Sequence, residues 1–360
     1  MVNHLGNWKN GELGDFVTLK RGFALPQQKR EDGQVPIFSS SGITGTHSTA
    51  MVKAPGVITG RYGTIGEVFY AAKDFWPLNT TLFVEDFHGN DAKFIYYFLK
   101  TLEWSKFTSA SAVPGINRNT VHKEIVSLPD IETQRRIAST LSMFDEKIKI
   151  NTEINDNLLD QAQTLYKQHF PYSVQDDLPD GWRIGTVGEI IEIHDSKRIP
   201  LSGADRMKME KKIYPYYGAA SLMDYVDNYI FDGKYLLLGE DGTVVDDAGY
   251  PILQYVWGQF WVNNHAHILT GRLGFNVESL YMLFKQTPVK SIVTGAVQPK
   301  ISQANLRSVQ VVIPPEHNLK EYNDLVEPLF SLLRANEEEC KSLAALRDTL
   351  LPKLMSGEID

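Results

Sequence analysis

The chain has 360 residues, which is enough for two domains of ordinary size and an element that joins them. A hydrophobic content of 42% with 11% aromatic residues excludes a disordered chain, and no window approaches the ~18 uninterrupted apolar residues that a membrane span needs. The single cysteine, Cys340, excludes an internal disulfide, and together with a start that lacks a signal-peptide pattern it predicts a cytoplasmic protein. The net charge of −8 predicts weak non-specific affinity for DNA, because few phosphates could be neutralised.

Residues 1–130 are broken by glycine and proline and contain β-branched and aromatic runs such as "GVITGRYGTIGEVFYA" and "NTTLFVED". Such runs predict short strands joined by turns. One helix is expected near 91–106, within "DAKFIYYFLKTLEWSK". The first 130 residues therefore read as a mixed, mainly β domain.

A glycine-free stretch follows at 131–170, and Pro171 is expected to close it. Its heptads place Ile137, Phe144, Asn151, Leu158 and Leu165 at a, and Leu141, Ile148, Asn155 and Ala162 at d. Five successive heptads are typical of a coiled-coil helix rather than of an ordinary core helix.

Residues 171–315 repeat the first pattern, with strand-like runs such as "KYLLLGEDGTVV" and "AHILTG" and one helix expected near 277–287. A second heptad stretch occupies 316–360, with Pro352 expected to close the helix. Position a holds Tyr322, Leu329, Asn336, Leu343 and Leu350, and position d holds Val326, Leu333, Cys340 and Arg347. Arg347 breaks the pattern, and the neighbouring Leu346 is expected to take its place.

Asn151 and Asn336 each occupy the central a position of their stretch. A buried asparagine at a fixes the register of a coiled coil, because only another polar group satisfies its amide. In an antiparallel pair of helices the two midpoints meet, so both residues are expected at about the same level. The alternative is that both face solvent and the heptad phase is shifted by one residue.

The chain contains an internal repeat. At an offset of 179, Pro36, Gly60, Gly63 and Thr64 match Pro215, Gly239, Gly242 and Thr243, and six extra residues then follow near 246–251. From there the offset is 185, and it relates Asn79, Pro114, Ile116, Val126, Pro129 and Asn151 to Asn264, Pro299, Ile301, Val311, Pro314 and Asn336. The fold class predicted is α+β: two mixed, mainly β domains separated by two long antiparallel coiled-coil helices with a pseudo-twofold axis.

No catalytic motif stands out. The chain lacks an Asn/Asp-Pro-Pro-aromatic motif and a Walker-type phosphate loop, and one cysteine with nine scattered histidines does not supply a zinc site. Asp180 and the Glu210-Lys211-Lys212 run imitate the paired acids and lysine of a nuclease, but the first is expected in a turn and the second in a basic loop. We therefore predict a non-catalytic chain that binds no metal.

The stretches "VQPKISQANLRSVQVVIPP", "LPDIETQRRIASTLSMFDEKIKINTEINDNLLDQAQTLYKQHF" and "LRDTLLPKLMSGEI" closely resemble type I restriction-modification specificity subunits. The resemblance extends over essentially the whole chain. It implies a subunit that binds a bipartite, asymmetric target in double-stranded DNA and docks two modification (methyltransferase) subunits through its helices. It also implies that S-adenosylmethionine belongs to the methyltransferase partner, that ATP and Mg belong to restriction/translocase partners, and that this chain has no cofactor.

Residue type and expected loop position suggest the DNA-binding residues. The candidates are Lys20, Arg21, Ser39, Ser40, Arg61, Tyr62, Asn117 and Arg118 in the first copy and Lys197, Arg198, Tyr216, Tyr217, Glu240, Lys300 and Gln303 in the second. Arg61 and Glu240 are corresponding positions inside a Gly-x-x-Gly-Thr turn; an arginine prefers guanine, and a glutamate can accept from cytosine. The alternative is that these turns are solvated hairpins. Since Tyr216 and Tyr217 alternate on a strand, one of them is expected in the core.

Two other classes of protein stay open. A pure interaction scaffold with two β-rich domains would show no sequence-selective DNA binding even with methyltransferase partners present. A self-sufficient nuclease would cleave DNA with a metal ion and lose this activity on substitution of Asp180 or Glu210.

Overall fold

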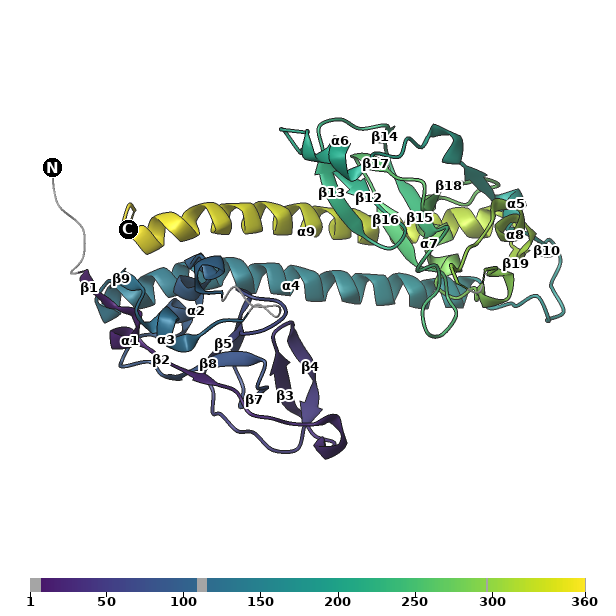
Figure 1. Ribbon diagram of the computed structural model, residues 1–360. Coiled ribbons are helices and arrows are strands. Elements are labelled where there is room, and N and C mark those ends of the chain that lie inside the picture. The colour runs from purple at the N-terminus through teal and green to yellow at the C-terminus, as the bar shows by residue number, and fades with distance from the viewer. Residues whose placement is uncertain (1–7, 109–114, 296, 360) are drawn as a thin grey trace. The chain divides into compact units, whose positions relative to one another are not determined.

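The computed structural model describes residues 8–108, 115–295 and 297–359 (Figure 1). The chain divides into two compact units, which we call unit 1 (residues 1–151 and 338–360) and unit 2 (residues 152–337). Each unit combines one mainly β part with a section of each of two long helices.

Unit 1 contains a four-stranded sheet of order β2-β8-β5-β6, a three-stranded sheet of order β4-β3-β7 and the pair β1-β9. The strands are β1 (Lys9–Glu12), β2 (Thr18–Arg21), β3 (Val35–Ser39), β4 (Gly42–His47), β5 (Gly56–Gly60), β6 (Val68–Ala71), β7 (Trp76–Pro77), β8 (Thr81–Asp86) and β9 (Ile125–Leu128). The short helices are α1 (Leu13–Phe16), η1 (Gln27–Lys29), α2 (Ala92–Thr101), η2 (Trp104–Phe107) and α3 (Arg118–His122).

Unit 2 contains two four-stranded sheets, of order β11-β18-β15-β16 and β13-β12-β17-β14, and the pair β10-β19. The strands are β10 (Arg183–Thr186), β11 (Ile191–Ile193), β12 (Tyr214–Tyr217), β13 (Leu222–Val226), β14 (Phe231–Asp232), β15 (Tyr235–Gly239), β16 (Leu253–Val256), β17 (Gln259–Val262), β18 (Ala266–Gly271) and β19 (Gln310–Ile313). The short helices are α5 (Val187–Ile190), η3 (Asp195–Lys197), α6 (Gly203–Met207), α7 (Val277–Phe284), η4 (Lys290–Ile292) and α8 (Gln303–Ser308).

Strand registers show that the internal repeat is structural. The antiparallel pair β1-β9 sets Lys9 opposite Leu128, and β10-β19 sets Arg183 opposite Ile313. The sheets β2-β8-β5-β6 and β11-β18-β15-β16 likewise have the same strand order and the same antiparallel pairings. The mixed α/β fold therefore contains the same arrangement twice.

The helix predicted near 91–106 begins after Asp91, whose side chain accepts from the main-chain N–H groups of Lys93 and Phe94. This capping satisfies two donors that a helix start leaves without partners. The apolar face of α2 then buries Phe94, Ile95, Tyr97, Phe98 and Leu99 in the core of unit 1. Full burial of each such side chain stabilises the fold by roughly 1.5–3 kcal/mol.

The long helices are α4 (Ile131–His169) and α9 (Glu316–Ser356). The heptad positions predicted as a and d are all buried or half-buried. Asn151 is fully buried and Asn336 is 8% exposed, so the alternative in which both face solvent is wrong. In unit 1, Asn151 Nδ2 donates to Glu339 Oε2 (2.7 Å), and in unit 2, Asn336 Nδ2 donates to Asn155 Oδ1 (2.9 Å).

Two expectations about α9 are wrong. The helix continues through Pro352 to Ser356, because Leu354 and Met355 bury their side chains in the core of unit 1 and so offset the hydrogen bond that the proline removes. Leu346 does not replace Arg347, since it is 48% exposed while Arg347 Nη1 bonds Asp145 Oδ1 at 2.6 Å. In the part of the chain that the structure describes, neither long helix has an apolar stretch sufficient for a bilayer.

Candidate nucleic-acid interface

One turn recurs in both units, where β5 or β15 ends. In unit 1 the main-chain N–H of Arg61 donates to Thr80 O (2.8 Å), and in unit 2 that of Glu240 donates to His265 O (2.9 Å). Arg61 O then accepts from Ile116 N (3.0 Å), just as Glu240 O accepts from Ile301 N (2.8 Å). We call Gly60–Tyr62 with Gly115–Arg118 turn site 1, and Gly239–Asp241 with Lys300–Gln303 turn site 2.

Turn site 1 contains two arginines, and a third lies beside it. Arg61 donates from Nε to Ile116 O (3.3 Å), its guanidinium lies 4.4 Å from the centre of the Tyr62 ring, and its Nη1 is buried without a partner among the described residues. Arg21, at the end of the adjacent strand β2, and Arg118, the first residue of α3, are both exposed. Within the described ranges no carboxylate forms an ion pair with any of the three, so this site holds unneutralised positive charge.

Two glycines allow the chain to close up at turn site 1. A Cβ atom at Gly115 would lie 2.2 Å from the Tyr62 ring, and one at Gly60 would lie 1.9 Å from Thr64 O. Both distances are too short for any other residue, which explains why the Gly-x-x-Gly-Thr turn needs its first glycine.

The other candidates of the first copy lie around this site or serve the fold. Asn117 caps α3 by accepting from Asn119 N (3.0 Å), and Lys20 forms an ion pair with Glu85. Ser39 Oγ bonds Gly42 O (3.2 Å), and Ser40 lies beside Gly63 of the turn, with Oγ 3.2 Å from where a Cβ would stand.

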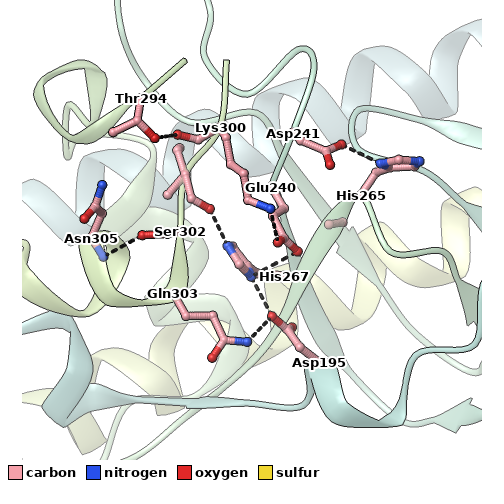
Figure 2. A network of polar contacts seen from close by, with 12 residues as sticks. Asp195, Glu240, Asp241, His265, His267, Thr294, Lys300, Ser302, Gln303 and Asn305 are labelled. Atoms are coloured by element: carbon pink, nitrogen blue, oxygen red, sulfur yellow. Dashed lines mark hydrogen bonds and ion pairs between the residues drawn. The ribbon is translucent and has the colours of Figure 1, made fainter. Parts of the chain in front are cut away.

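Turn site 2 is built differently, as Figure 2 shows. Glu240 Oε1 lies 3.2 Å from Lys300 Nζ. Glu240 Oε2 also accepts from Arg198 Nη1 (2.6 Å). Asp195, the first residue of η3, accepts at Oδ2 from Gln303 Nε2 (2.6 Å) and lies 2.6 Å from His267 Nδ1. Four predicted residues of the second copy, Arg198, Glu240, Lys300 and Gln303, therefore meet in one polar network.

The network is largely enclosed. The side chains of Arg198 and Glu240 are each 13% exposed, and that of Asp195 is 5% exposed. Burial acts to raise the pKa of both carboxyl groups. The hydrogen bond from His267 and the charges of His267 and Arg198 outweigh burial at Asp195, and bonds from Arg198 and Lys300 do so at Glu240, so each pKa lies below its usual value.

Two expectations for the second copy are therefore corrected. Both carboxylate oxygens of Glu240 are engaged by cationic side chains, so Glu240 is not an open acceptor for a cytosine amino group. Tyr216 is 1% exposed and its hydroxyl accepts from Leu201 N (3.1 Å), so it belongs to the core and not to a DNA contact. The expectation that one of the two tyrosines is core is confirmed, with Tyr217 half-buried at the end of β12 and Lys197 exposed in η3.

Asp195, Glu240 and His267 also place one ligand atom each within 4.8 Å of one another, which is a spacing that could hold a metal ion. In this structure Arg198 and Lys300 supply positive charge to the two carboxylates, and His267 Nε2 faces the carbonyl of Ile301 (2.8 Å). The arrangement is thus an ion network made from the chain's own side chains.

Asp195 and His267 were not among the candidates. Their signal in the sequence was indirect: His267 takes the position on β18 that Leu82 has on β8, and Asp195, two residues beyond the end of β11, lies beside His267 as Arg21 lies opposite Leu82. The second copy has extra residues between Asp195 and β12, where α6 lies, and this shift of offset hid the match.

A family model described as "Type I restriction modification DNA specificity domain" matches residues 6–160 and again 179–344. The chain therefore belongs to this family, whose specificity subunits are non-catalytic and carry no catalytic cofactor.

Relatives extend over most of the chain. A putative type I specificity subunit of Mycoplasma pneumoniae is 27% identical over 98% of this chain and 97% of its own length. The MjaIX specificity subunit of Methanocaldococcus jannaschii is 23% identical over 75% of this chain and 70% of its own length. The crystal structure of a type I restriction-modification S subunit from M. genitalium covers 99% of this chain and 98% of its own, with a TM-score of 0.63 at 20% identity, and so shares the fold.

Proposed function

We propose that this chain is the DNA sequence-specificity subunit of a type I restriction-modification complex, and that each unit reads one half-site of a bipartite, asymmetric target in double-stranded DNA. The observation that carries the proposal is the pair of turn sites. They share two main-chain hydrogen bonds, but their side chains differ at the equivalent pairs Arg61 and Glu240, Tyr62 and Asp241, and Arg118 and Gln303. Two turns with matching main-chain hydrogen bonds but different side chains suit a DNA target whose two half-sites differ in sequence.

Turn site 1 offers side chains that can contact the edge of a base. The guanidinium of Arg61 is held by one bond to Ile116 O and by the ring of Tyr62, and it forms no ion pair with a carboxylate among the described residues. A guanine edge offers two acceptors that match such a guanidinium. Arg21 and Arg118 beside it are suited to phosphates.

At turn site 2 the exposed groups are Lys197, Lys300 and Gln303. The ammonium of Lys300 lies against Glu240 but remains 49% exposed, so it can still approach a DNA backbone. Gln303 begins α8 in the place that Arg118 has at the start of α3. We expect this half-site to be read through neutral and lysine groups rather than through arginines.

The same proposal covers the helices and the partners. We propose target-recognition domains at 1–130 and 171–315, and antiparallel coiled-coil helices at 131–170 and 316–360 that dock two modification subunits and, through them, restriction subunits. Exposed apolar side chains support docking: Met143 (61%) and Ile150 (49%) lie one heptad apart on α4, and Leu325 (50%) and Leu332 (47%) do so on α9. S-adenosylmethionine, ATP and Mg would belong to those partners.

The test is sequencing of genomic DNA for modified adenines in cells with and without this gene. A bipartite adenine-methylated motif that vanishes on deletion, and returns when the gene is restored, is the expected result. Unchanged methylation in cells that express a co-purifying methyltransferase partner would contradict the proposal and favour a scaffold that binds no DNA.

A further inference from the structure

His267 has no exposed surface, and both nitrogens of its ring face oxygen atoms. Nδ1 lies 2.6 Å from Asp195 Oδ2, and Nε2 lies 2.8 Å from the main-chain oxygen of Ile301 (Figure 2). A main-chain carbonyl can only accept, so Nε2 carries a proton.

The second nitrogen must carry a proton as well. Asp195 already accepts from Ile268 N at Oδ1 (3.0 Å) and from Gln303 Nε2 at Oδ2 (2.6 Å), and Arg198 Nη2 lies 3.4 Å away. A carboxyl group among these donors is an ionised acceptor, so Nδ1 donates to it. In this arrangement both ring nitrogens of His267 stand as hydrogen-bond donors.

His267 holds the segment that forms one side of turn site 2. Ile301 lies in this segment between Lys300 and Gln303; its N–H donates to Glu240 O (2.8 Å), and its carbonyl accepts from His267. We propose that His267, as a buried imidazolium, is the positioning residue that fixes Lys300–Gln303 for recognition of the half-site that unit 2 reads. This inference rests on the proposed function and adds a residue to it.

In unit 1 a different residue contacts the equivalent segment. Leu82 stands on β8 where His267 stands on β18, and the carbonyl of Ile116, equivalent to that of Ile301, accepts from Arg61 Nε (3.3 Å). In unit 1 the segment that contains Ile116 is thus held by Arg61, which is itself a candidate DNA-binding residue. In unit 2 the equivalent segment is held by His267, which is buried and cannot reach DNA.

The charged groups around the imidazolium explain why a neutral ring would not serve. Asp195 Oδ2 and Glu240 Oε2 lie 2.6 and 3.7 Å from Nδ1. Arg198 contacts the same two oxygens, and Lys300 contacts Glu240 Oε1. Without the proton on Nδ1, a lone pair would face two carboxylates, and the segment would lose the bridge from Asp195 to Ile301 O.

The experiment compares methylation motifs made in cells by the full complex with the wild-type chain and with His267→Gln. A glutamine amide can still donate to Ile301 O, but it lacks the charge and has no second donor nitrogen to face Asp195. We expect selectivity at one half of the bipartite motif to relax by about tenfold, the size of one lost base discrimination, while the other half keeps its wild-type selectivity.

His194→Gln is the matched control, because His194 is half-buried in the same unit, bonds Thr270 Oγ1 (2.7 Å) and touches neither Lys300 nor Gln303 through any described hydrogen bond. Its variant should keep the selectivity of both half-motifs. Equal relaxation in the two variants, or none in His267→Gln, would overturn the positioning role. If the wild-type chain gives no bipartite motif, the proposed function fails instead.

A second measurement serves if His267→Gln does not fold. Nitrogen-15 spectra of the histidine-labelled, full-length chain at pH 7.5 should show one of the nine histidines with both ring nitrogens protonated and protected from exchange. A neutral pattern for every protected histidine would overturn the proposal.

Discussion

Turn site 1 and turn site 2 share main-chain hydrogen bonds but differ in the charge of the side chains at equivalent positions. Three equivalent positions hold Arg21, Arg61 and Arg118 in unit 1, and Asp195, Glu240 and Gln303 in unit 2. In unit 1 the three guanidinium groups form no ion pair with a carboxylate among the described residues. In unit 2 the carboxylates lie against Arg198, Lys300 and His267. Since the main-chain hydrogen bonds are the same, the side chains alone decide whether charge is available to DNA.

This difference separates two tasks. In unit 2 the charged groups hold the turn together, so they contribute to stability and to the placement of the segment. In unit 1 the charged groups have no carboxylate partner among the described residues, so under the proposed function we expect them to contribute to affinity and to base choice. Substitutions in the two units test whether the charged groups differ in this way.

The largest effect is expected for Asp195→Ala. Removing this carboxylate takes away the nearest anion of the buried His267 and leaves Arg198 with Glu240 alone, and loss of one partner of a buried ion pair costs about 3–5 kcal/mol. We expect a fall of that order in the free energy of unfolding of unit 2, measured by denaturant titration with hydrogen exchange as the local reporter.

Arg21→Ala is the equivalent substitution in unit 1 and should change stability by less than about 0.5 kcal/mol, because the side chain is exposed. Comparable losses in the two variants would show that turn site 1 is also held by charge, which would remove the difference between the units.

Arg61→Lys should act on base choice rather than on folding. A lysine cannot make the paired contact of a guanidinium with guanine, so we expect discrimination at one position of one half-site to fall by about 1–3 kcal/mol. Sequencing of methylated sites gives the measurement. Glu240→Gln provides the contrast, since it should lower the stability of unit 2 without replacing a base preference.

Acid should open turn site 2 before turn site 1. Because the folded-state pKa values of Asp195 and Glu240 lie below their usual values, the unfolded chain binds more protons at low pH. Their stabilisation is complete above about pH 5, begins to fall near the unfolded-state pKa of about 4, and is lost as the pH falls through the lower folded-state pKa values, at roughly 1.4 kcal/mol for each pKa unit that separates the two states. Hydrogen exchange of peptides that cover 299–303 and 115–118, corrected for intrinsic rates, measures it; the variant Asp195→Asn with Glu240→Gln should show no such acid dependence.

The smallest effect concerns salt. Arg118→Ala should lower the slope of log binding constant against log salt by about 1 for the full complex, because one phosphate contact is lost. Gln303→Ala, at the equivalent helix start, should leave that slope unchanged. A slope change in both would mean that turn site 2 also contacts phosphates through this position.

The sequence predicted several elements closely, each for a local reason. The helix at α2 follows from the Asp91 cap and its apolar face, and the buried positions of α4 and α9 follow from the heptad pattern. The correspondence of Arg61 with Glu240 followed from the glycines of the turn, where Gly60 and Gly239 are closely approached by backbone and Gly63 and Gly242 have positive φ. The helix end at Pro352 was predicted wrongly, because burial of Leu354 and Met355 outweighs a local propensity.

By itself, the amino-acid sequence determined the repeat, the heptads and the positions of the turns, since these depend on periodicity and on residues with special backbone geometry. Only the tertiary structure decided which polar residues are free. Asp195, His267 and Gln303 are separated by 72 and 36 positions in the chain, yet they meet within hydrogen-bonding distance. Whether Glu240 faces DNA or a buried arginine depends on strands brought together by folding, and no local pattern in the sequence encodes that contact.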